Sequence, residues 1–176
     1  GALKSQILGD NLVETEIGVP KINWNEIPLN QNLDTKNLKI KIVNKNNIEH
    51  IGGTSVNVGN PHVVFFVDNI EDYDLKKIGP EIENHKYFPE KCNVTLAQVI
   101  NKKLIKVKVW ERGAGLTKAC GTAACATAVA ANINELTDKT TDIEFALGRL
   151  SISIDKNNSI HMKGPVSDIE NIEINI

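Results

Sequence analysis

The stretch GTAACATAVAANI at residues 121–133 decides the fold of this chain. It is rich in alanine, the best helix former, and it has almost no polar stripe, so a helix here must be buried on every side. Its small side chains let the surrounding strands approach closely. We therefore predict an α+β fold in which a strongly curved, mostly antiparallel sheet wraps around one central helix.

Short strands account for most of the remaining sequence. Alternating polar and apolar residues predict half-buried strands at 38–43 and 104–110, and the continuous apolar run at 62–67 is typical of a strand covered on both faces. A polar helix is expected at 72–84, broken by Gly79-Pro80. Further strands are expected at 12–17, 142–147, 150–154, 160–163 and 169–176.

Cys120 stands directly before the predicted central helix, after a glycine-containing loop that begins with Glu111-Arg112. The backbone N–H groups and the dipole at a helix start favour the thiolate form of a cysteine. The same N–H groups, here those of Gly121 and Thr122, can hold a carboxylate. A thiolate beside a bound carboxylate points to proton transfer at the α-carbon of an amino or carboxylic acid, and inversion of that carbon needs a second proton donor on the opposite face.

Composition excludes several classes of protein. With 176 residues, 41% of them hydrophobic, the chain suits one domain with a real core. A formal net charge of −2 argues against nucleic-acid and acidic-membrane partners, and no apolar run approaches the length of a membrane span. Three cysteines, an odd number without a disulfide framework, predict free thiols in a reducing, cytoplasmic compartment. No His/Cys spacing fits a zinc site, so no metal is expected.

Four motifs, in this order, resemble the diaminopimelate epimerase family of cofactor-independent amino-acid racemases. They are Gly59-Asn60-Pro61-His62, the FPEKCNV run at 88–94, the ERGAG run at 111–115 and Ala119-Cys120-Gly121-Thr122. The resemblance implies epimerisation of LL-diaminopimelate to meso-diaminopimelate, a precursor of lysine and peptidoglycan, by two cysteine thiols without any cofactor. It covers almost all of this chain but only the second part of the family's length.

The resemblance also implies roles for individual residues. Cys120 matches the second catalytic cysteine of the family, and His62 and Glu111 would help to set the protonation of the cysteines. Gly121 and Thr122 would bind the reacting carboxylate. The far amino-acid end of the substrate would be held by Asn60, Asn93, Glu111 and Arg112.

Two departures from the family pattern lie close to these motifs. Ala123 stands where a glycine is usual, and Cys92 adds a thiol at a variable position. The first catalytic cysteine of the family sits in a Gly-Asn-Gly motif that does not occur here, and neither Cys92 nor Cys125 lies in a matching motif. We expect both of these thiols to be structural.

The missing motif predicts a divided domain organisation. Residues 1–20 are expected to be a trailing strand and linker from an N-terminal domain, 21–165 the C-terminal epimerase domain, and 166–176 a tail strand that returns to the N-terminal domain. The chain would then hold half of a catalytic pair and be inactive alone. Exposed strand edges near Leu12 and Ile172 would invite pairing between copies, that is, a homodimer.

Other interpretations remain open on the residues alone. A lone Cys120 could be a small buried hydrophobe, His62 a strand-end histidine, and Glu111-Arg112 a surface ion pair. A related racemase or isomerase of the proline, hydroxyproline or phenazine type would fit the same fold. The absent first cysteine also allows a non-catalytic binding module. Asn60, Asn93 and Arg112 discriminate against the related racemases, because only a substrate with two amino-acid ends should need them. An upstream half of the gene with a Gly-Asn-Gly cysteine motif would leave the binding module with little support.

Overall fold

The computed structural model describes residues 2–9 and 11–167. Its main feature is a ten-stranded sheet in the order β1-β2-β12-β11-β10-β8-β7-β6-β5, with β9 paired to β8, and a separate hairpin of β3 and β4. The strands are β1 (Lys4–Gly9), β2 (Leu12–Gly18), β3 (Ile40–Val43), β4 (Glu49–Gly52), β5 (Thr54–Asn57), β6 (Pro61–Phe66), β7 (Asn93–Asn101), β8 (Leu104–Glu111), β9 (Gly115–Thr117), β10 (Thr140–Phe145), β11 (Gly148–Ile154) and β12 (Ile160–Pro165).

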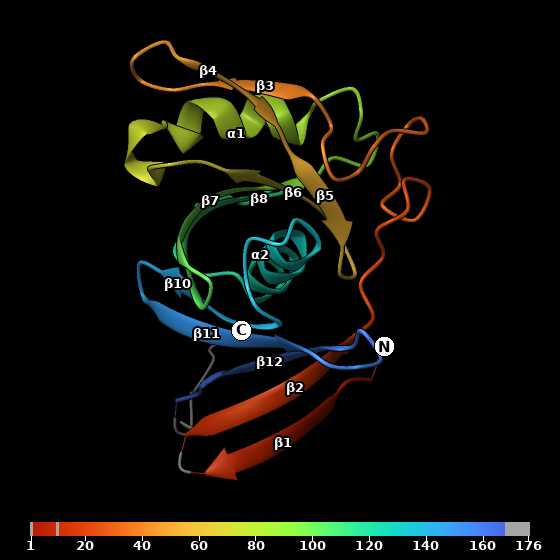
Figure 1. The fold of residues 1–176 in the computed structure, drawn as a ribbon, viewed down its shortest axis with the longest axis vertical. Helices are drawn as coiled ribbons and strands as arrows, with labels where there is room; N and C mark the ends of the chain where they lie inside the picture. Colours follow the sequence, from red (N-terminus) through yellow and green to blue (C-terminus); the bar gives the residue numbers. More distant parts are fainter. Residues whose placement is uncertain (1, 10, 168–176) are drawn as a thin grey trace, which may run out of the picture.

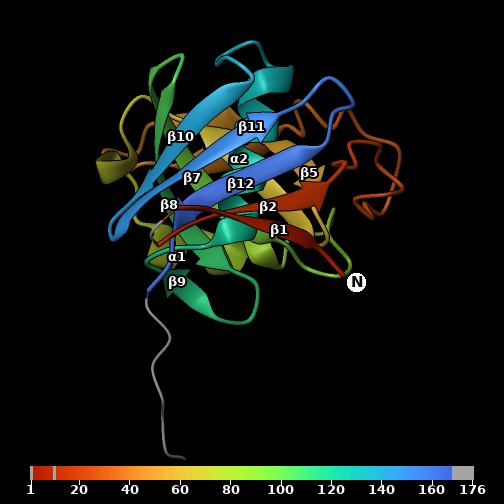
Figure 2. The ribbon, with the colours of Figure 1, turned by 90° about the horizontal axis from the view of Figure 1, so that it is seen from below.

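Helix α2 (Gly121–Ile133) lies inside the curve of this sheet (Figure 1). Strands β5 to β8 pass over one side of the helix, and β10 to β12 pass under the other (Figure 1, Figure 2). The described pairs β6–β7 and β8–β10 are parallel and the other strand pairs are antiparallel. Residues 123–131 of the helix are all buried. The predicted α+β fold, with a curved, mostly antiparallel sheet around a central helix, is therefore confirmed.

A second layer covers the outer face of β6, β7 and β8. It consists of α1 (Leu75–Glu83), a short 3-10 helix (Ile70–Asp72) and the β3–β4 hairpin (Figure 1). Val64 of β6 packs in the core around α2, whereas its neighbours Val63 and Phe65 pack in the core against α1. The strand predicted at 62–67 is thus covered on both faces, as its continuous apolar run indicated.

The predicted break at Gly79-Pro80 is wrong, because α1 runs through both residues. Pro80 lacks the N–H that would bond to the carbonyl four residues earlier. The helix nevertheless continues, because Leu75, Ile78 and Ile82 bury one apolar face of it. Gly79 is needed for this packing: a Cβ atom there would lie 2.4 Å from the ring of Trp110.

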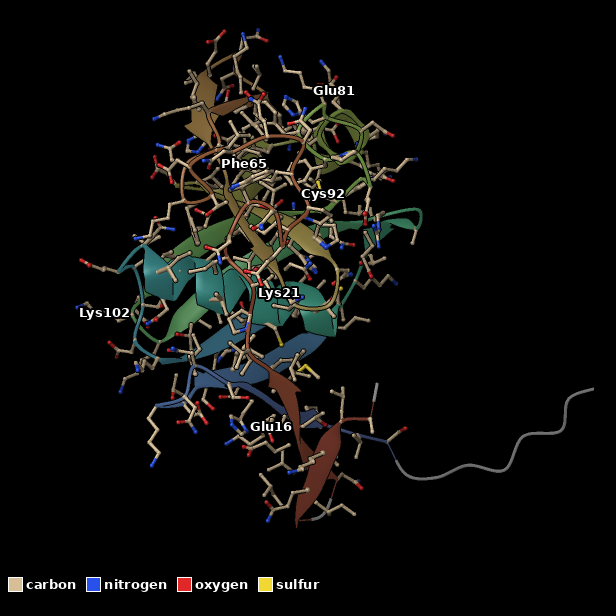
Figure 3. The ribbon with its side chains drawn as sticks, turned by 90° about the vertical axis from the view of Figure 1, so that its right-hand side faces the viewer. Glu16, Lys21, Phe65, Glu81, Cys92 and Lys102 are labelled. Atoms are coloured by element: carbon tan, nitrogen blue, oxygen red, sulfur yellow. The ribbon has the colours of Figure 1, made fainter. Side chains whose placement is uncertain are left out.

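The N-terminal ribbon of β1 and β2 extends the sheet beyond the region that surrounds α2 (Figure 1, Figure 3). The expectation of an exposed edge at the strand near Leu12 is wrong, because β2 pairs with β1 on one side and with β12 on the other. The exposed edge belongs to β1, which the sequence did not predict and where Ile7 is 80% exposed. The tail strand expected at 169–176 lies outside the described residues, and the domain boundaries remain a prediction.

Among the described residues, every helix falls short of the length and apolar character that a bilayer crossing requires.

Candidate active site

Cys120 is the residue that immediately precedes the first turn of α2. Its backbone is extended, with φ −154°, and its carbonyl accepts the first helical hydrogen bond from Ala124 N–H at 3.0 Å. The side chain is held close to the helix, with Sγ 3.5 Å from Thr122 Oγ1. Cys120 is 9% exposed, whereas Cys92 and Cys125 are 0% exposed. Of the three cysteines, Cys120 alone retains any exposed surface.

The net electrostatics at Cys120 differ from the sequence-based expectation. Burial, the largest effect, raises the pKa of the thiol, and the nearby Glu111 carboxylate raises this pKa further. The Thr122 hydroxyl and the Ala123 N–H lower the pKa. The N–H group at the helix start thus favours the thiolate, as expected, but the loss of hydration outweighs it and leaves the pKa raised. The effect of Glu111 on this pKa indicates that its carboxylate lies close to the Cys120 thiol.

The buried His62, at the start of β6, pairs with the half-buried Asn60. The His62 Nε2–H donates to Asn60 Oδ1 at 2.9 Å, since the amide oxygen can only accept. Burial, and secondarily the charge of Arg112, lowers the pKa of His62 to about 3. The imidazole is therefore neutral near pH 7. Among the described residues, its Nδ1 has no hydrogen-bond partner.

Asn93 joins the start of β7 to the loop that follows β8. Its Nδ2 donates to Pro61 O at 3.0 Å, and its Oδ1 accepts from Arg112 N–H at 3.0 Å. Arg112 Nη1 donates in turn to Glu90 O at 2.7 Å. Asn93 is only 3% exposed, so its first effect is to fix the backbone of Arg112, whose side chain is exposed.

The predicted residues therefore form one connected group rather than scattered positions. Asn60 is hydrogen-bonded to His62, and Asn93 is hydrogen-bonded both to the carbonyl of Pro61, which lies between Asn60 and His62 in the chain, and to the Arg112 N–H. Glu111, the neighbour of Arg112, interacts with Cys120. Cys92 lies on the α1 side of the sheet (Figure 3), and Cys125 is in the core around α2. These two thiols are sealed by packing, as predicted.

A pocket of about 240 Å³ opens beside Cys120. Its other walls include Phe145, Leu147, Arg149 and Leu150 of the β10–β11 hairpin and Pro165 of β12. Sequence reasoning did not place Arg149 at the site, although it is one of only two arginines in the chain. Arg149 Nε donates to Glu144 at 2.7 Å. A larger cavity of about 550 Å³, lined partly by Lys45, contains none of the predicted site residues. We place the site by its chemistry rather than by cavity size.

No group of three His, Cys, Asp or Glu side chains in the described part of the chain is arranged to hold a metal ion. The polar groups beside Cys120 are N–H donors, a hydroxyl and a carboxylate. The N–H donors suit a carboxylate of a substrate, and the carboxylate acceptor suits an ammonium group.

Comparison with solved structures shows the fold. A phenazine biosynthesis protein from Bacillus anthracis aligns with 99% of this chain and 64% of its own, with a TM-score of 0.57 and 12% identity. A hydroxyproline epimerase from Agrobacterium vitis aligns with 88% of this chain and 50% of its own, with a TM-score of 0.52 and 10% identity. At these identities the likeness concerns the arrangement of helices and strands.

Sequence comparison shows the family. Residues 54–169 match the family described as Diaminopimelate epimerase. The chain is 75% identical to the Diaminopimelate epimerase of Pelagibacter ubique over 176 residues, which are 64% of that protein. It is 41% identical to that of Elusimicrobium minutum over 170 residues, 96% of this chain and 62% of that protein. The chain spans less than two thirds of these relatives, and it belongs to the diaminopimelate epimerase family.

Proposed function

We propose that this chain supplies one of the two thiols of a cofactor-independent diaminopimelate epimerase, and that Cys120 is that thiol. The observation that carries the proposal is the position of Cys120 at the start of the buried helix α2, next to Thr122 and Glu111. The reaction would convert LL-diaminopimelate to meso-diaminopimelate in the whole protein.

The proton transfer follows from this position. The Cys120 thiolate would take the α-proton, so that the C–H bond breaks and an S–H bond forms. The N–H groups of Gly121 and Thr122 would hold the α-carboxylate, which spreads the negative charge of the carbanion. A second thiol on the opposite face, outside this chain, would return a proton to carbon and leave the centre inverted.

The raised pKa of Cys120 suits both directions of this reaction. Burial makes the resting thiol protonated, ready to donate to a carbanion. It also makes the thiolate a stronger base than a hydrated one, which is needed because the α-proton of an amino acid is weakly acidic. The neutral His62 would act through its hydrogen bond to Asn60 rather than through a positive charge.

The far end of the substrate would meet the second part of the site. The Arg112 guanidinium can pair with a carboxylate through two parallel N–H groups, and Glu111 can accept from an ammonium. Asn60 and Asn93 would complete this part, Asn93 mainly by fixing Arg112. A substrate with one amino-acid end would leave these groups unpaired.

The test compares the full-length protein with a chain restricted to residues 1–176. Each is incubated with LL-diaminopimelate in deuterated buffer, and both α-deuterium uptake and conversion to the meso form are measured. We expect uptake and conversion by the full-length protein and neither by residues 1–176 alone. No uptake by the full-length protein would reject the function. Conversion by residues 1–176 alone would reject the proposal that the second thiol lies outside these residues.

The runner-up function is racemisation of proline or hydroxyproline, which the fold of the Agrobacterium vitis hydroxyproline epimerase favours. Proline has no second amino-acid end for Glu111 and Arg112. A competition assay that follows deuterium uptake into both substrates separates the two functions. Preferential uptake into proline would replace the diaminopimelate proposal, and loss of both would favour a binding module.

A further inference from the structure

Glu83 is a buried carboxylate that the proposed chemistry does not use. It is the last residue of α1 and is only 6% exposed. A carboxylate is rarely buried unless its oxygens are paired, because it loses hydration. A buried Glu83 carboxylate therefore needs hydrogen-bond donors for its oxygens.

Both oxygens of Glu83 accept hydrogen bonds from the segment 110–113, which comprises the end of β8 and the start of the following loop and contains the proposed substrate-binding pair. Oε2 accepts from the indole N–H of Trp110 at 2.7 Å, and Oε1 accepts from the backbone N–H of Gly113 at 3.1 Å. Lys91 Nζ lies 3.9 Å from Oε1. Trp110 and Gly113 are the residues on either side of Glu111-Arg112, so one carboxylate holds both ends of this pair.

Two further contacts fix the segment 110–113. The Trp110 ring packs against Gly79 of α1, where a Cβ atom would come within 2.4 Å of it. The Arg112 N–H is bonded to Asn93 Oδ1 at 3.0 Å. Three of the four residues from Trp110 to Gly113 are thus anchored to buried groups, and Glu111 is held between them.

The two hydrogen bonds made by the side chain at position 83 require a carboxylate. Its two partners are both N–H donors, and a carboxylate offers an acceptor oxygen to each. A glutamine of the same shape has a single acceptor oxygen, so one donor would face an NH₂ group. An aspartate is one methylene shorter and cannot keep both bonds without a shift of the loop.

We propose that Glu83 is a positioning residue that fixes Glu111 and Arg112, and thereby sets the affinity for the far end of a substrate with two amino-acid ends. This inference rests on the proposed function for its substrate. Glu83 touches neither the reacting carbon nor Cys120 in this arrangement, so it acts through the loop it holds.

The experiment uses full-length Glu83→Gln with Glu81→Gln as its matched control. Glu81 lies on the same helix but is exposed, so the control makes the same change of charge on the outer side of α1 (Figure 3). For Glu83→Gln we expect a roughly 10-fold rise in KM for diaminopimelate with a smaller change in kcat. The control should match the wild type. A fall in kcat at unchanged KM, or equal behaviour of the two variants, would overturn the inference.

A second measurement separates failure of the inference from failure of the proposed function. Amide hydrogen exchange of residues 111–115, measured without substrate, should be faster in Glu83→Gln and unchanged in Glu81→Gln. If the wild type does not act on diaminopimelate, this measurement alone decides whether Glu83 fixes the loop. Should Glu83→Gln fail to fold, Trp110→Phe removes one donor and keeps most of the ring, and it should accelerate the same exchange. Unchanged exchange would overturn the inference.

Discussion

The start of helix α2 and its body contain the same type of reactive side chain in opposite surroundings. Cys120, at the start, is 9% exposed and contacts the Thr122 hydroxyl, whereas Cys125, in the body, is 0% exposed. Burial raises the pKa of Cys125 to about 12, so its thiolate does not form near neutral pH. The helix body thus seals its cysteine by packing, whereas the helix start leaves its cysteine partly exposed beside polar groups.

The buried, neutral His62 should make the folded chain less stable as the pH falls. His62 has a pKa of about 3 in the folded state against 6.5 in the unfolded state. Between these pH values the imidazole is protonated in the unfolded chain but not in the folded chain. The free energy of unfolding therefore decreases as the pH is lowered. The expected slope is roughly 1 kcal/mol per pH unit. Urea unfolding of the wild type and His62→Gln from pH 7 to pH 4 measures it. Equal slopes in the two proteins would contradict the account.

The helix body should resist added volume more than the helix start does. Ala126 is 0% exposed, and Ala119, one residue before Cys120, is exposed. We expect Ala126→Leu to reduce the free energy of unfolding by about 1–3 kcal/mol, because the surrounding strands leave no room for a larger side chain. The matched Ala119→Leu should change it far less, although it borders the pocket beside Cys120. Urea unfolding of both variants checks this. An equal loss of unfolding free energy in the two variants would contradict the expected difference between the helix body and the helix start.

A smaller effect should appear in thiol reactivity. Thr122 lowers the pKa of Cys120 and Glu111 raises it. Below that pKa, Thr122→Val should therefore slow alkylation of Cys120 by iodoacetamide, and Glu111→Gln should accelerate it, each by about threefold. Mass spectrometry of the folded full-length protein reads the rates, with Cys92 and Cys125 as unmodified internal controls. Alkylation of Cys125 as fast as Cys120 would show that the two regions do not differ.

The sequence predicted the features that one local pattern determines. The helix at residues 121–133 was found with its observed bounds, because an alanine-rich segment without a polar stripe has few alternatives. Strand β1 was missed because its residues are exposed on both faces and show no alternation. Strand β5 was missed because it is four residues long and partly polar.

In the candidate site, too, the sequence predicted the residues that lie close together in the chain and missed those that only the fold brings together. Motifs placed Cys120, Glu111 and Arg112 near one another, because they lie close together in the chain. Glu83 carried no signal, because its partners Trp110 and Gly113 are 27 and 30 residues away and meet it only through the packing of α1 on the sheet. Arg149 likewise reaches the pocket beside Cys120 only through the pairing of β10 with β11.

The most direct test of the central claim is the conversion of LL- to meso-diaminopimelate by full-length Cys120→Ala and Cys125→Ala, measured beside their thermal unfolding. We predict that Cys120→Ala reduces conversion about 1,000-fold or more while its unfolding stays close to that of the wild type. Cys125→Ala should keep most of the conversion and unfold at a lower temperature, because it leaves a small gap in the core. Conversion by Cys120→Ala at the wild-type rate would contradict the assignment of the reacting thiol to the start of α2.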